Sequence, residues 1–596
     1  MTAINNFLRN FNKRIPSDYL TALLFFAFCT ASGINLLCLD DYDALTLSAV
    51  NTINIAVFWT VFAICGAVML FVAYYFNKKY FISRGLLVSV AFFGFVTSLY
   101  NSRNIYLIIG FAVIVFLSVY WCVQKNRINI NNPEFSTKAM YISILCIALL
   151  VGTVLFVTAY CRYKSYNAPN FDFGIFASAF ENMRKTGLPV TTCERNVVMS
   201  HFGVHFSPVF YLLLPVYMLC PCPETLIFLQ VLFIIAGVIP TVLICRHFKI
   251  ENILTFTIAI VYLIFPGFIC GGINDFHENA FLTFIILFLM YFILENKNVM
   301  FWIFLGLLFS VKEDAAIYAF AIGLFMMFYR KSYLKSAVVI VLSIAYFIFA
   351  SLIVEACNTL DTGIMTDRLI NYMPKGQNSL LSVVYTCFYD FPYLIAQVFN
   401  SEKLGFLMWV LIPLGFAPFM SKKKSLLLLL LPLLVINLMS NWQYQYDIEY
   451  HYTFGTGALL IFCFITVIAE KSNKKKAFLC IFSLIMSFIM CAGASFDKLV
   501  YIPYYTSKSE TFSKWDEFIS KLSKDKEYTA TSELIAHMYD FSQVYAYPDY
   551  YGENRQTPYL LITENDFELN PNLENYIEDN NYKISNEYYG IILYEK

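Results

Sequence analysis

Runs of about twenty apolar residues recur along most of the chain, and they constrain the fold more than any other feature of the sequence. A helix needs about twenty such residues to cross a bilayer, and in lipid only helices and closed barrels satisfy their own backbone hydrogen bonds. The composition agrees, since 59% of the 596 residues are hydrophobic and 14% are charged, against about a quarter charged in soluble domains. The sequence therefore predicts an all-α polytopic membrane protein.

The basic residues of the short loops predict the orientation of the chain. Lys and Arg concentrate in cytoplasmic loops, and Arg9, Lys13 and Arg14 precede the first apolar run. No cleavage pattern follows that run, so we expect an uncleaved first span and a cytoplasmic N-terminus. One short, Pro-bounded apolar piece, Ser207–Pro223, is expected to lie on the outer face. Roughly fifteen spans then leave the C-terminus outside the cytoplasm.

Changes in composition along the chain predict three regions. They are a four-helix membrane extension at 1–130, a membrane core at 139–497 with a large outer loop at 161–223, and a soluble extracytoplasmic α/β domain at 500–596. After Tyr501 the charge density rises and the long apolar runs stop. Within that region 516–522 is typical of a helix, and 559–563 and 590–594 are typical of strands.

Charge and cysteine usage exclude some classes of function. The net charge is zero, so the overall charge of the chain gives no indication of nucleic-acid binding. The sixteen cysteines are scattered, mostly inside apolar runs, as expected for small hydrophobic residues rather than a disulfide framework or a zinc site. Cys220 and Cys222, in CPC, are too close in sequence for an ordinary disulfide and lack metal-ligand spacing.

Ionisable residues are costly at membrane depth and are therefore functional candidates. On the predicted topology, most of them collect at span ends on the outer face, together with five of the six histidines. The candidates are Asp172 for catalysis and, for substrate binding, His201, His205, Asp275, His277, Glu278, Lys312, Glu313, Asp314 and His451.

Asp172 and the first two histidines also have structural interpretations. Asp172 is a favourable N-cap for a helix that starts near Gly174. His201 and His205 are four residues apart and can share a helical face as metal ligands. Gly203 lies between them and weakens such a helix, which favours an interfacial structural role for both histidines.

The remaining candidates have structural interpretations of their own. Residues 312–314 can form a self-neutralising cluster that lets two short spans turn. Residues 275–278 can mark a solvated span end, and His451 can belong to an interfacial aromatic belt. Asp41 and Asp43 can hold a cation through their carboxylates, although an ordinary polar loop is the favoured interpretation.

The outer-face location restricts the chemistry. Nucleoside triphosphates are not expected there, and the chain has no P-loop. A polyprenyl-phosphate sugar is a donor that needs no nucleotide. Its transfer requires a general base for the acceptor hydroxyl, for which we predict Asp172. It also requires positive charge for the leaving phosphate, from Lys312 with Arg162 or Arg184, or from a divalent cation. The histidines and Glu278 would orient the sugar or hold such a metal.

Five motifs resemble, in the same order, those of the domain-of-unknown-function 2079 family of predicted membrane proteins. They are FDFGIF, HFSP, DFHENAF, VKEDAA and HYTF, and the resemblance runs from about Tyr141 to the C-terminus. The chain departs from the family pattern at Ala536, which precedes His537 where the family typically has proline.

That family is similar to the GT-C superfamily of glycosyltransferases that use lipid-linked sugars. The resemblance implies a GT-C-like membrane core and a lipid-linked sugar donor, and by position it matches Asp172 to the acid of the first outer loop. Two other interpretations stay open: a transporter or flippase of lipid-linked sugars, and a non-catalytic envelope scaffold. The sequence does not identify the sugar, the acceptor or the cofactor.

Overall fold

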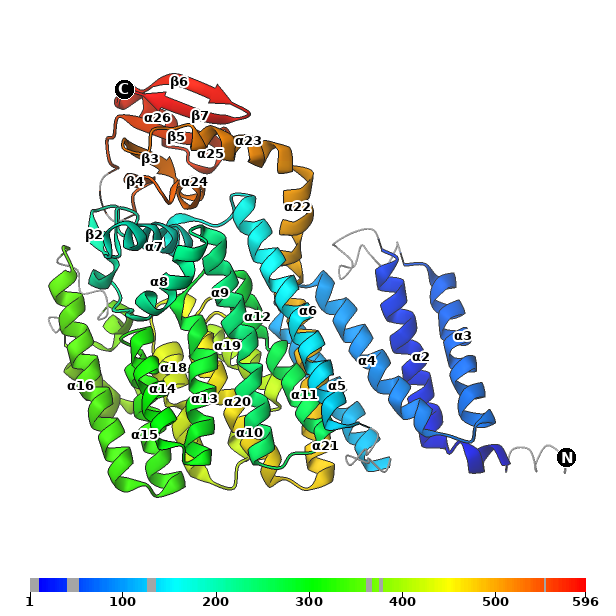
Figure 1. Cartoon of the computed structure of the whole chain (residues 1–596). Coiled ribbons are helices and arrows are strands. Elements are labelled where there is room, and N and C mark those ends of the chain that lie inside the picture. The colour runs from blue at the N-terminus through cyan, green and yellow to red at the C-terminus, as the bar shows by residue number, and fades with distance from the viewer. Residues whose placement is uncertain are drawn as a thin grey trace.

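The structure is a helical bundle that carries a small sheet domain at one end (Figure 1). It is a computed structural model, and it describes residues 10–39, 53–125, 135–360, 367–374, 379–550, 552 and 554–596. We call the end of the bundle next to the sheet the domain end.

Within those ranges, eleven helical stretches are long and apolar enough to cross a membrane. They are α2 (Ser17–Leu37), α3 (Ile55–Tyr75), α4 (Tyr80–Tyr100), α5 (Ile105–Lys125), α6 (Thr137–Lys164), α9–α10 (Pro223–His247), α11–α12 (Asn252–Ile273), η4–α13 (Glu278–Glu295), α16 (Tyr333–Cys357), α20 (Thr453–Glu470) and α21–α22 (Asn473–Ser507). The bent pair α18 (Phe391–Val398) and α19 (Ser401–Leu411) adds a twelfth if it forms one span.

The number of full-length spans is below the roughly fifteen expected, because three expected spans form shorter helices. Two of these, α14 (Asn298–Val311) and α15 (Ala315–Phe325), are separated by the polar turn at residues 312–314. The third is the short helical stretch Lys424–Leu438, in which Pro432 lies between η9 (Lys424–Leu430) and η10 (Leu433–Leu438). Proline has no amide hydrogen to donate and disrupts a regular helix.

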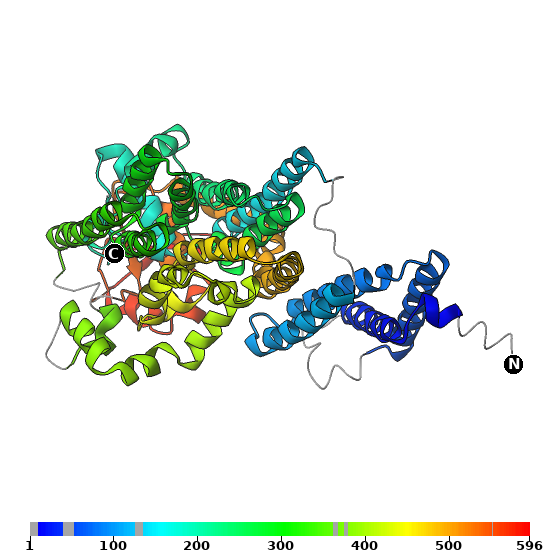
Figure 2. The ribbon, with the colours of Figure 1, turned by 90° about the horizontal axis from the view of Figure 1, so that it is seen from below.

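Helices α2 to α5 stand beside the rest of the bundle (Figures 1 and 2). They contact it through α21, where Phe95 of α4 stacks on Phe488 with ring centroids 4.6 Å apart. A Cβ at Gly94 would lie 2.4 Å from Ile489, so the two helices approach closely at this glycine. Small residues permit such close packing between helices in a membrane.

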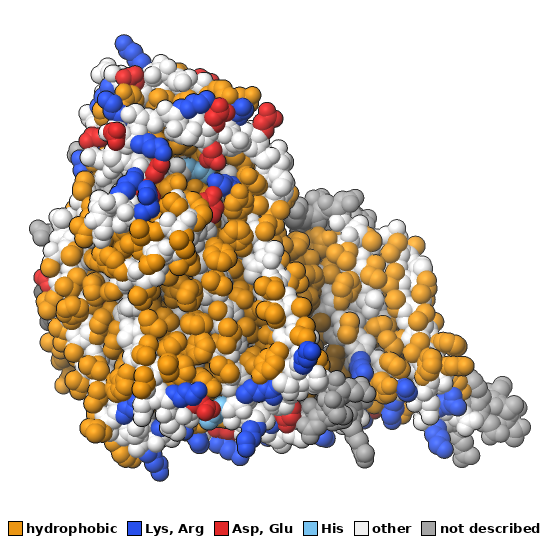
Figure 3. Space-filling model, viewed as in Figure 1, with side chains coloured by type: hydrophobic (Ala, Val, Ile, Leu, Met, Phe, Trp, Pro, Cys, Tyr) orange, Lys and Arg blue, Asp and Glu red, His pale blue; other side chains and the backbone are white. Residues whose placement is uncertain are grey.

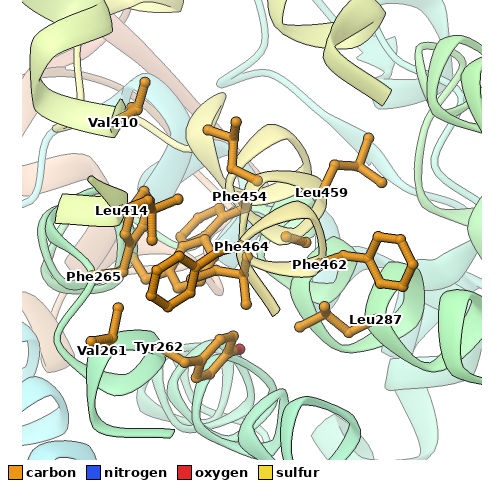
Figure 4. Close-up of a cluster of buried hydrophobic side chains, with 14 of the residues drawn as sticks. Val261, Tyr262, Phe265, Leu287, Val410, Leu414, Phe454, Leu459, Phe462 and Phe464 are labelled. Carbon is orange, nitrogen blue, oxygen red and sulfur yellow. The ribbon is translucent and has the colours of Figure 1, made fainter. Parts of the chain in front are cut away.

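Helix α20 forms the centre of the bundle. Every residue from Thr453 to Ile468 is buried, as expected for a helix that is apolar on all sides. Phe454, Phe462 and Phe464 point outward from α20 into side chains of neighbouring helices (Figure 4). Because lipid tails are as apolar as these side chains, close packing rather than removal from water holds α20 in place.

The short helix α8 (Val209–Leu219) is the piece expected to lie on the outer face. It has 11 residues, too few to cross a bilayer of ordinary thickness. It lies at the domain end with α7 (Ile175–Thr186) and with β2 (Met199–Ser200), which pairs with β1 (Val190–Thr191) (Figure 1).

The C-terminal domain contains a five-stranded mixed sheet in the order β4-β3-β5-β7-β6. The strands are β3 (Glu527–Thr531), β4 (Gln543–Tyr547), β5 (Tyr559–Thr563), β6 (Lys583–Tyr588) and β7 (Ile591–Glu595), and the helices are α23 (Ser509–Ser520), α24 (Ser532–Ile535), α25 (Asp566–Leu569) and α26 (Leu573–Asp579). Strand β3 runs parallel to β4 and β5, and the other pairs are antiparallel. The helix expected at 516–522 is the end of α23, and the two expected strands are β5 and β7.

Side chains from the loop after α7 cover the free edge of this sheet. The backbone N–H of Val544 donates to Thr192 Oγ1 (3.0 Å), and the Val544 carbonyl accepts from the same hydroxyl (2.6 Å). Asn196 pairs in the same way with the N–H and carbonyl of Ala546, at 2.6 and 2.8 Å. These bonds satisfy the edge of β4, which would otherwise expose unpaired backbone groups, and they fix the domain to the bundle.

On the face shown in Figure 3, charged side chains leave a wide apolar band across the middle of the bundle. On the face shown, Lys and Arg gather at the end opposite the sheet domain, whereas both signs of charge cover the domain itself. This distribution is expected of a protein whose middle is embedded in lipid.

Candidate functional site

All ten predicted site residues lie at the domain end, in loops or first turns that join the helices there. Asp172 is on η2 (Asn170–Gly174), His201 on η3 (His201–Gly203), His205 in the loop after it, Asp275 to Glu278 between α12 and α13, residues 312–314 between α14 and α15, and His451 before α20. Their separation in the chain exceeds 270 residues, so only the fold brings them together. We call this set, with Arg368, the polar cluster.

Asp172 has an unusual backbone. Its φ of 67° and ψ of −74° interrupt the helical path between Phe171 and Gly174. A non-glycine residue in a sparsely populated region costs on the order of 1–3 kcal/mol and persists when its surroundings fix it. Here the Asn170 N–H donates to Ser532 Oγ of the sheet domain, and the Asn170 side chain donates to the Cys193 carbonyl, both at 3.0 Å.

Asp172 does not cap a helix. Helix α7 starts at Ile175, its N-cap is Gly174, and no side chain caps it. The capping interpretation is therefore wrong. The carboxylate instead faces the polar cluster, where Asp172 Oδ2 lies 3.7 Å from Nδ1 of His451.

The environment of Asp172 favours its protonated form. Although the side chain is 38% exposed, the protein around it removes much of its hydration, and this desolvation raises its pKa to about 7. The charges of Asp275 and Glu278 raise the pKa further, and Lys312 opposes them. A carboxyl group with a pKa near 7 is suited to accept a proton at neutral pH.

Two histidines form a stacked pair beside Asp172. The rings of His277 and His451 lie 3.2 Å apart at an interplanar angle of 15°. Burial, followed by the neighbouring positive charges, lowers the pKa of each ring well below its ordinary value, so both are neutral. Gln230 holds this segment, because its Oε1 accepts from the His277 N–H at 2.8 Å.

Lys312 supplies a positive charge inside the cluster. It is 0% exposed, and its Nζ lies 4.0 Å from Glu278 Oε1 and 5.9 Å from the ring centre of Tyr452. Burial lowers the pKa of Lys312, but Glu278 and the adjacent acids raise it above its ordinary value, so the ammonium stays charged.

Arg368 supplies a second positive charge that sequence reasoning missed. It lies on η6 (Asp367–Tyr372), and its guanidinium is 5.5 Å from the ring centre of Tyr452, the ring that Lys312 also faces. Burial alone would lower its pKa, but Tyr452 and the nearby carboxyl groups raise it. The available signal was a lone arginine in the long loop predicted on the outer face, and without the fold this arginine points to no partner.

The other two histidines each pair with a different glutamate. His201 Nδ1 contacts Glu194 Oε2 at 2.9 Å, and His205 Nδ1 contacts Glu313 Oε1 at 2.8 Å. Their ring centres are 6.0 Å apart. Within the described ranges, no three His, Cys, Asp or Glu side chains have the geometry to hold a metal ion. Asp41 and Asp43, the other possible cation ligands, lie outside those ranges.

Glu278 connects Lys312 to the segment that precedes α8. Its Oε1 accepts a hydrogen bond from Ser207 Oγ at 3.1 Å, and the same oxygen faces Lys312. Glu278 is completely buried. A buried carboxylate needs such partners, because an isolated one would lose its hydration without compensation.

Arg162 and Arg184, the expected partners of Lys312, each pair with a carboxylate, and that of Arg162 belongs to the polar cluster. Arg162 pairs with Asp275 through two contacts of 2.5 and 3.3 Å. Arg184 pairs with Glu181 on its own helix, at 2.9 and 2.7 Å. The positive charges that face Asp172 are therefore those of Lys312 and Arg368.

Several polar atoms of the cluster are buried without a hydrogen-bond partner among the residues that the structure describes. They are His201 Nε2, Glu278 Oε2, Lys312 Nζ, Asp314 Oδ1 and His451 Nε2. Such atoms are uncommon in folded proteins. Their concentration around one exposed carboxylate is the pattern expected where a polar ligand binds.

A separate pocket of about 400 Å³ lies among α2, α4 and α5 and is lined by Asp18, Phe25 and Trp121, among others. It shares no residue with the polar cluster. The candidate site is therefore defined by the charged and hydrogen-bonding side chains of the polar cluster and not by this pocket.

Among solved structures, the chain is similar to ArnT from Cupriavidus metallidurans, determined with undecaprenyl phosphate bound. The TM-score is 0.48 at 10% identity, and the match covers 77% of this chain and 98% of that one. A similarity of this size does not bear on function. No match was found among curated proteins. The family model described as "Predicted membrane protein (DUF2079)" matches residues 162–593, and since this is well over half of the chain, the chain belongs to the DUF2079 family of predicted membrane proteins.

Proposed function

We propose that the chain is a membrane glycosyltransferase with a GT-C-like core. It moves a sugar from a polyprenyl-phosphate donor to a cell-envelope acceptor on the extracytoplasmic face. The observation that carries this proposal is a partly exposed carboxyl group with a pKa of about 7, Asp172, beside two cations, Lys312 and Arg368.

Asp172 is the general base in this reaction. Its carboxylate takes the proton of an acceptor hydroxyl as the hydroxyl oxygen attacks the anomeric carbon of the donor. The bond from that carbon to the phosphate oxygen breaks, and the polyprenyl phosphate leaves with the bonding electrons. One direct displacement inverts the anomeric configuration. The raised pKa suits this role, because a base works best when its pKa is near the working pH.

Lys312 and Arg368 stabilise the leaving phosphate. The guanidinium offers a planar set of donors and the ammonium a compact charge, and both types of side chain bind phosphate. Both face the Tyr452 ring, at 5.9 and 5.5 Å. Charges already in place at the developing negative charge lower the barrier without reorganisation.

The neutral histidines and Glu278 orient the sugar. Stacked His277 and His451 present ring nitrogens that bond to hydroxyl groups without adding charge. His451 Nε2, which has no hydrogen-bond partner among the described residues, offers a donor or acceptor to the sugar. Glu278 Oε2, which lies 3.1 Å from His277 Nδ1, offers an acceptor.

The distribution of charge supports the proposed orientation of the chain. Lys and Arg gather at the end opposite the sheet domain (Figure 3), and the positive-inside rule assigns that end to the cytoplasm. The polar cluster and the sheet domain then face outward, where lipid-linked sugars serve as donors. A substrate path for transport would need polar groups near the midplane, whereas this cluster lies at one end of the bundle, which favours the enzyme.

A turnover assay tests the proposal. The purified protein in lipid is given a panel of polyprenyl-phosphate sugars with cell-envelope extract as acceptor, and release of polyprenyl phosphate is measured for the native chain and for Asp172→Asn. We expect release by the native chain and its loss in the variant at an unchanged melting temperature. Equal release by both would remove Asp172 from the base role. Movement of an intact donor across the bilayer without release would identify a transporter, and neither release nor movement would identify a scaffold.

A further inference from the structure

We propose that Cys220 and Cys222 form a reversible dithiol–disulfide pair that exchanges with an external disulfide. The two residues lie between the surface helix α8 and the span that begins with α9 (Pro223–Ala236), at the domain end. This proposal goes beyond the transferase, because it concerns two side chains outside the polar cluster.

The thiols are close because the backbone between them is folded back. Cys220 Sγ and Cys222 Sγ are 3.6 Å apart. The Cys222 N–H donates to the Cys220 carbonyl at 2.9 Å, which closes a three-residue γ-turn around Pro221. A disulfide needs a sulfur–sulfur distance of about 2.05 Å. Small side-chain rotations cover the difference without a shift of the flanking helices.

A neighbouring hydroxyl fixes this turn. Thr225 Oγ1 donates to the same Cys220 carbonyl at 2.6 Å, and the Thr225 N–H donates to the Cys222 carbonyl at 3.1 Å. The hydroxyl also contacts Cys222 Sγ at 3.6 Å. The first turn of α9 therefore holds the two cysteines together before any oxidation, which distinguishes them from a chance pair on a mobile loop.

The two thiols differ in access and therefore in role. Cys220 is exposed, whereas Cys222 is half-buried. Burial raises the pKa of Cys222 to about 11, so its thiolate is scarce at neutral pH. Reactivity of a thiol requires the thiolate and access. Cys220 is therefore the thiol that attacks, and Cys222 is the thiol that resolves.

The exchange balances in two steps. The Cys220 thiolate attacks one sulfur of the external disulfide, forms a mixed disulfide and releases one thiolate. Cys222 loses its proton and attacks the Cys220 sulfur, so the Cys220–Cys222 bond forms and the second external thiol leaves. The chain gives up two electrons and two protons, and the external disulfide is reduced to two thiols. An i, i+2 disulfide closes a small, strained ring, and strained or exposed disulfides are the easily reduced ones.

Oxidation at graded ratios of oxidised to reduced glutathione tests the pair in the full-length protein. Each sample is quenched with acid, alkylated and digested, and the masses of the cysteine peptides are measured. We expect the peptide with Cys220 and Cys222 to lose two hydrogens and to escape alkylation. Because the second step is intramolecular, this should need on the order of tenfold less oxidised glutathione than glutathione attachment at Cys38, the exposed cysteine that follows α2.

Two variants make the test specific. Cys222→Ser leaves a lone thiol at 220, which should carry glutathione and never lose two hydrogens. Thr225→Val keeps the shape of the side chain but removes the hydroxyl, and it should shift half-oxidation to several-fold more oxidised glutathione. The proposal is overturned if both cysteines in the native chain take alkyl groups or glutathione independently, at the ratios that modify Cys38, or if Thr225→Val leaves the midpoint unchanged. None of these readouts depends on transferase activity.

Discussion

Asp172 and His451 meet at the domain end although 278 residues separate them, with Oδ2 of the carboxylate 3.7 Å from Nδ1 of the imidazole. Burial keeps the imidazole neutral. The contact therefore adds no positive charge to oppose desolvation of the carboxylate, and Asp172 retains a high pKa. The pKa of Asp172 therefore depends less on His451, its nearest neighbour, than on the more distant charges of Asp275 and Lys312.

The pH dependence of turnover should report Asp172. Because the base must be ionised, kcat/KM is expected to fall as the pH drops below about 7, the pKa of Asp172, with a limb that corresponds to one proton. Initial rates of polyprenyl phosphate release between pH 5 and about pH 9 would check this. A flat profile across pH 7 would contradict the assignment.

Lys312→Met should shift the acidic limb of the kcat/KM profile to higher pH. Lys312 lowers the pKa of Asp172, so its removal raises the apparent pKa of kcat/KM above 7. It should also reduce kcat by on the order of 10²–10³, the loss found when one stabilising group is removed. His451→Gln is the matched control for the pKa, because it removes a neutral ring and should leave the limb in place. A limb that stays at pH 7 in Lys312→Met would show that the ammonium does not act on Asp172.

Arg368→Gln should weaken binding of polyprenyl phosphate. Loss of hydrogen bonds to a charged group costs about 1.5–3 kcal/mol, or roughly 10–100-fold in Kd. Arg184→Gln serves as the control, since the Arg184 guanidinium already pairs with Glu181. Binding would be measured by titration of the protein in detergent. Equal affinities for the two variants would place the phosphate elsewhere.

Substitutions of Asp172 should show that its backbone conformation lowers the stability of the fold while its side chain is needed for activity. Glycine adopts a φ of 67° readily and alanine does not. Asp172→Gly should therefore be more stable than Asp172→Ala by about 1–2 kcal/mol, while both are inactive. Melting in detergent would measure the difference, and a more stable alanine variant would refute the backbone strain.

The stability of Asp172→Asn relative to the native chain should depend on pH. The folded-state pKa of Asp172, about 7, is above its ordinary value of 3.8, so ionisation destabilises the folded state. The native chain should therefore lose stability relative to the variant as the pH rises from about 4 to about 7, with no further change above that range. Parallel melting curves of the two proteins over this range would test the sign.

His537→Phe should loosen the sheet domain. His537 contacts Asp516 Oδ1 at 2.9 Å and the Tyr163 carbonyl at 3.0 Å, and it stacks on Tyr166 at 3.7 Å. Phenylalanine keeps the stacking but removes both hydrogen bonds of the imidazole, at a cost of about 0.5–1.5 kcal/mol each. We expect a lower melting temperature and faster proteolysis near residue 500.

His247→Phe is the matched control for His537→Phe. His247 pairs with Glu295 at 2.6 Å, but this pair is partly exposed at the opposite end of the bundle. Exposed pairs contribute little to stability, so the melting temperature should barely change. An equal effect of the two substitutions would show that His537 does not fix the domain.

The sequence by itself determined the parts of the structure that depend on local pattern. Apolar runs of sufficient length located the spans, and the loss of those runs after Tyr501 located the sheet domain. The short helix α8 followed from its length and its bounding prolines. The candidate site could also be predicted as a set, because a charged group near lipid is costly wherever it occurs in the chain.

Only the tertiary structure decided how the members of that set pair. Arg162 pairs with Asp275, a member of the cluster, and Arg184 pairs with Glu181 outside it, while Arg368, which no motif marks, faces Tyr452 beside Lys312. Ion pairing depends on distances between segments hundreds of residues apart, and sequence spacing does not encode those distances. The backbone two residues before Asp172 is likewise held by Ser532 of the sheet domain, through the Asn170 N–H. The unusual backbone of Asp172 therefore depends on the packing of the domain against the bundle, and its raised pKa depends on charges that the fold brings together, such as Asp275 and Lys312.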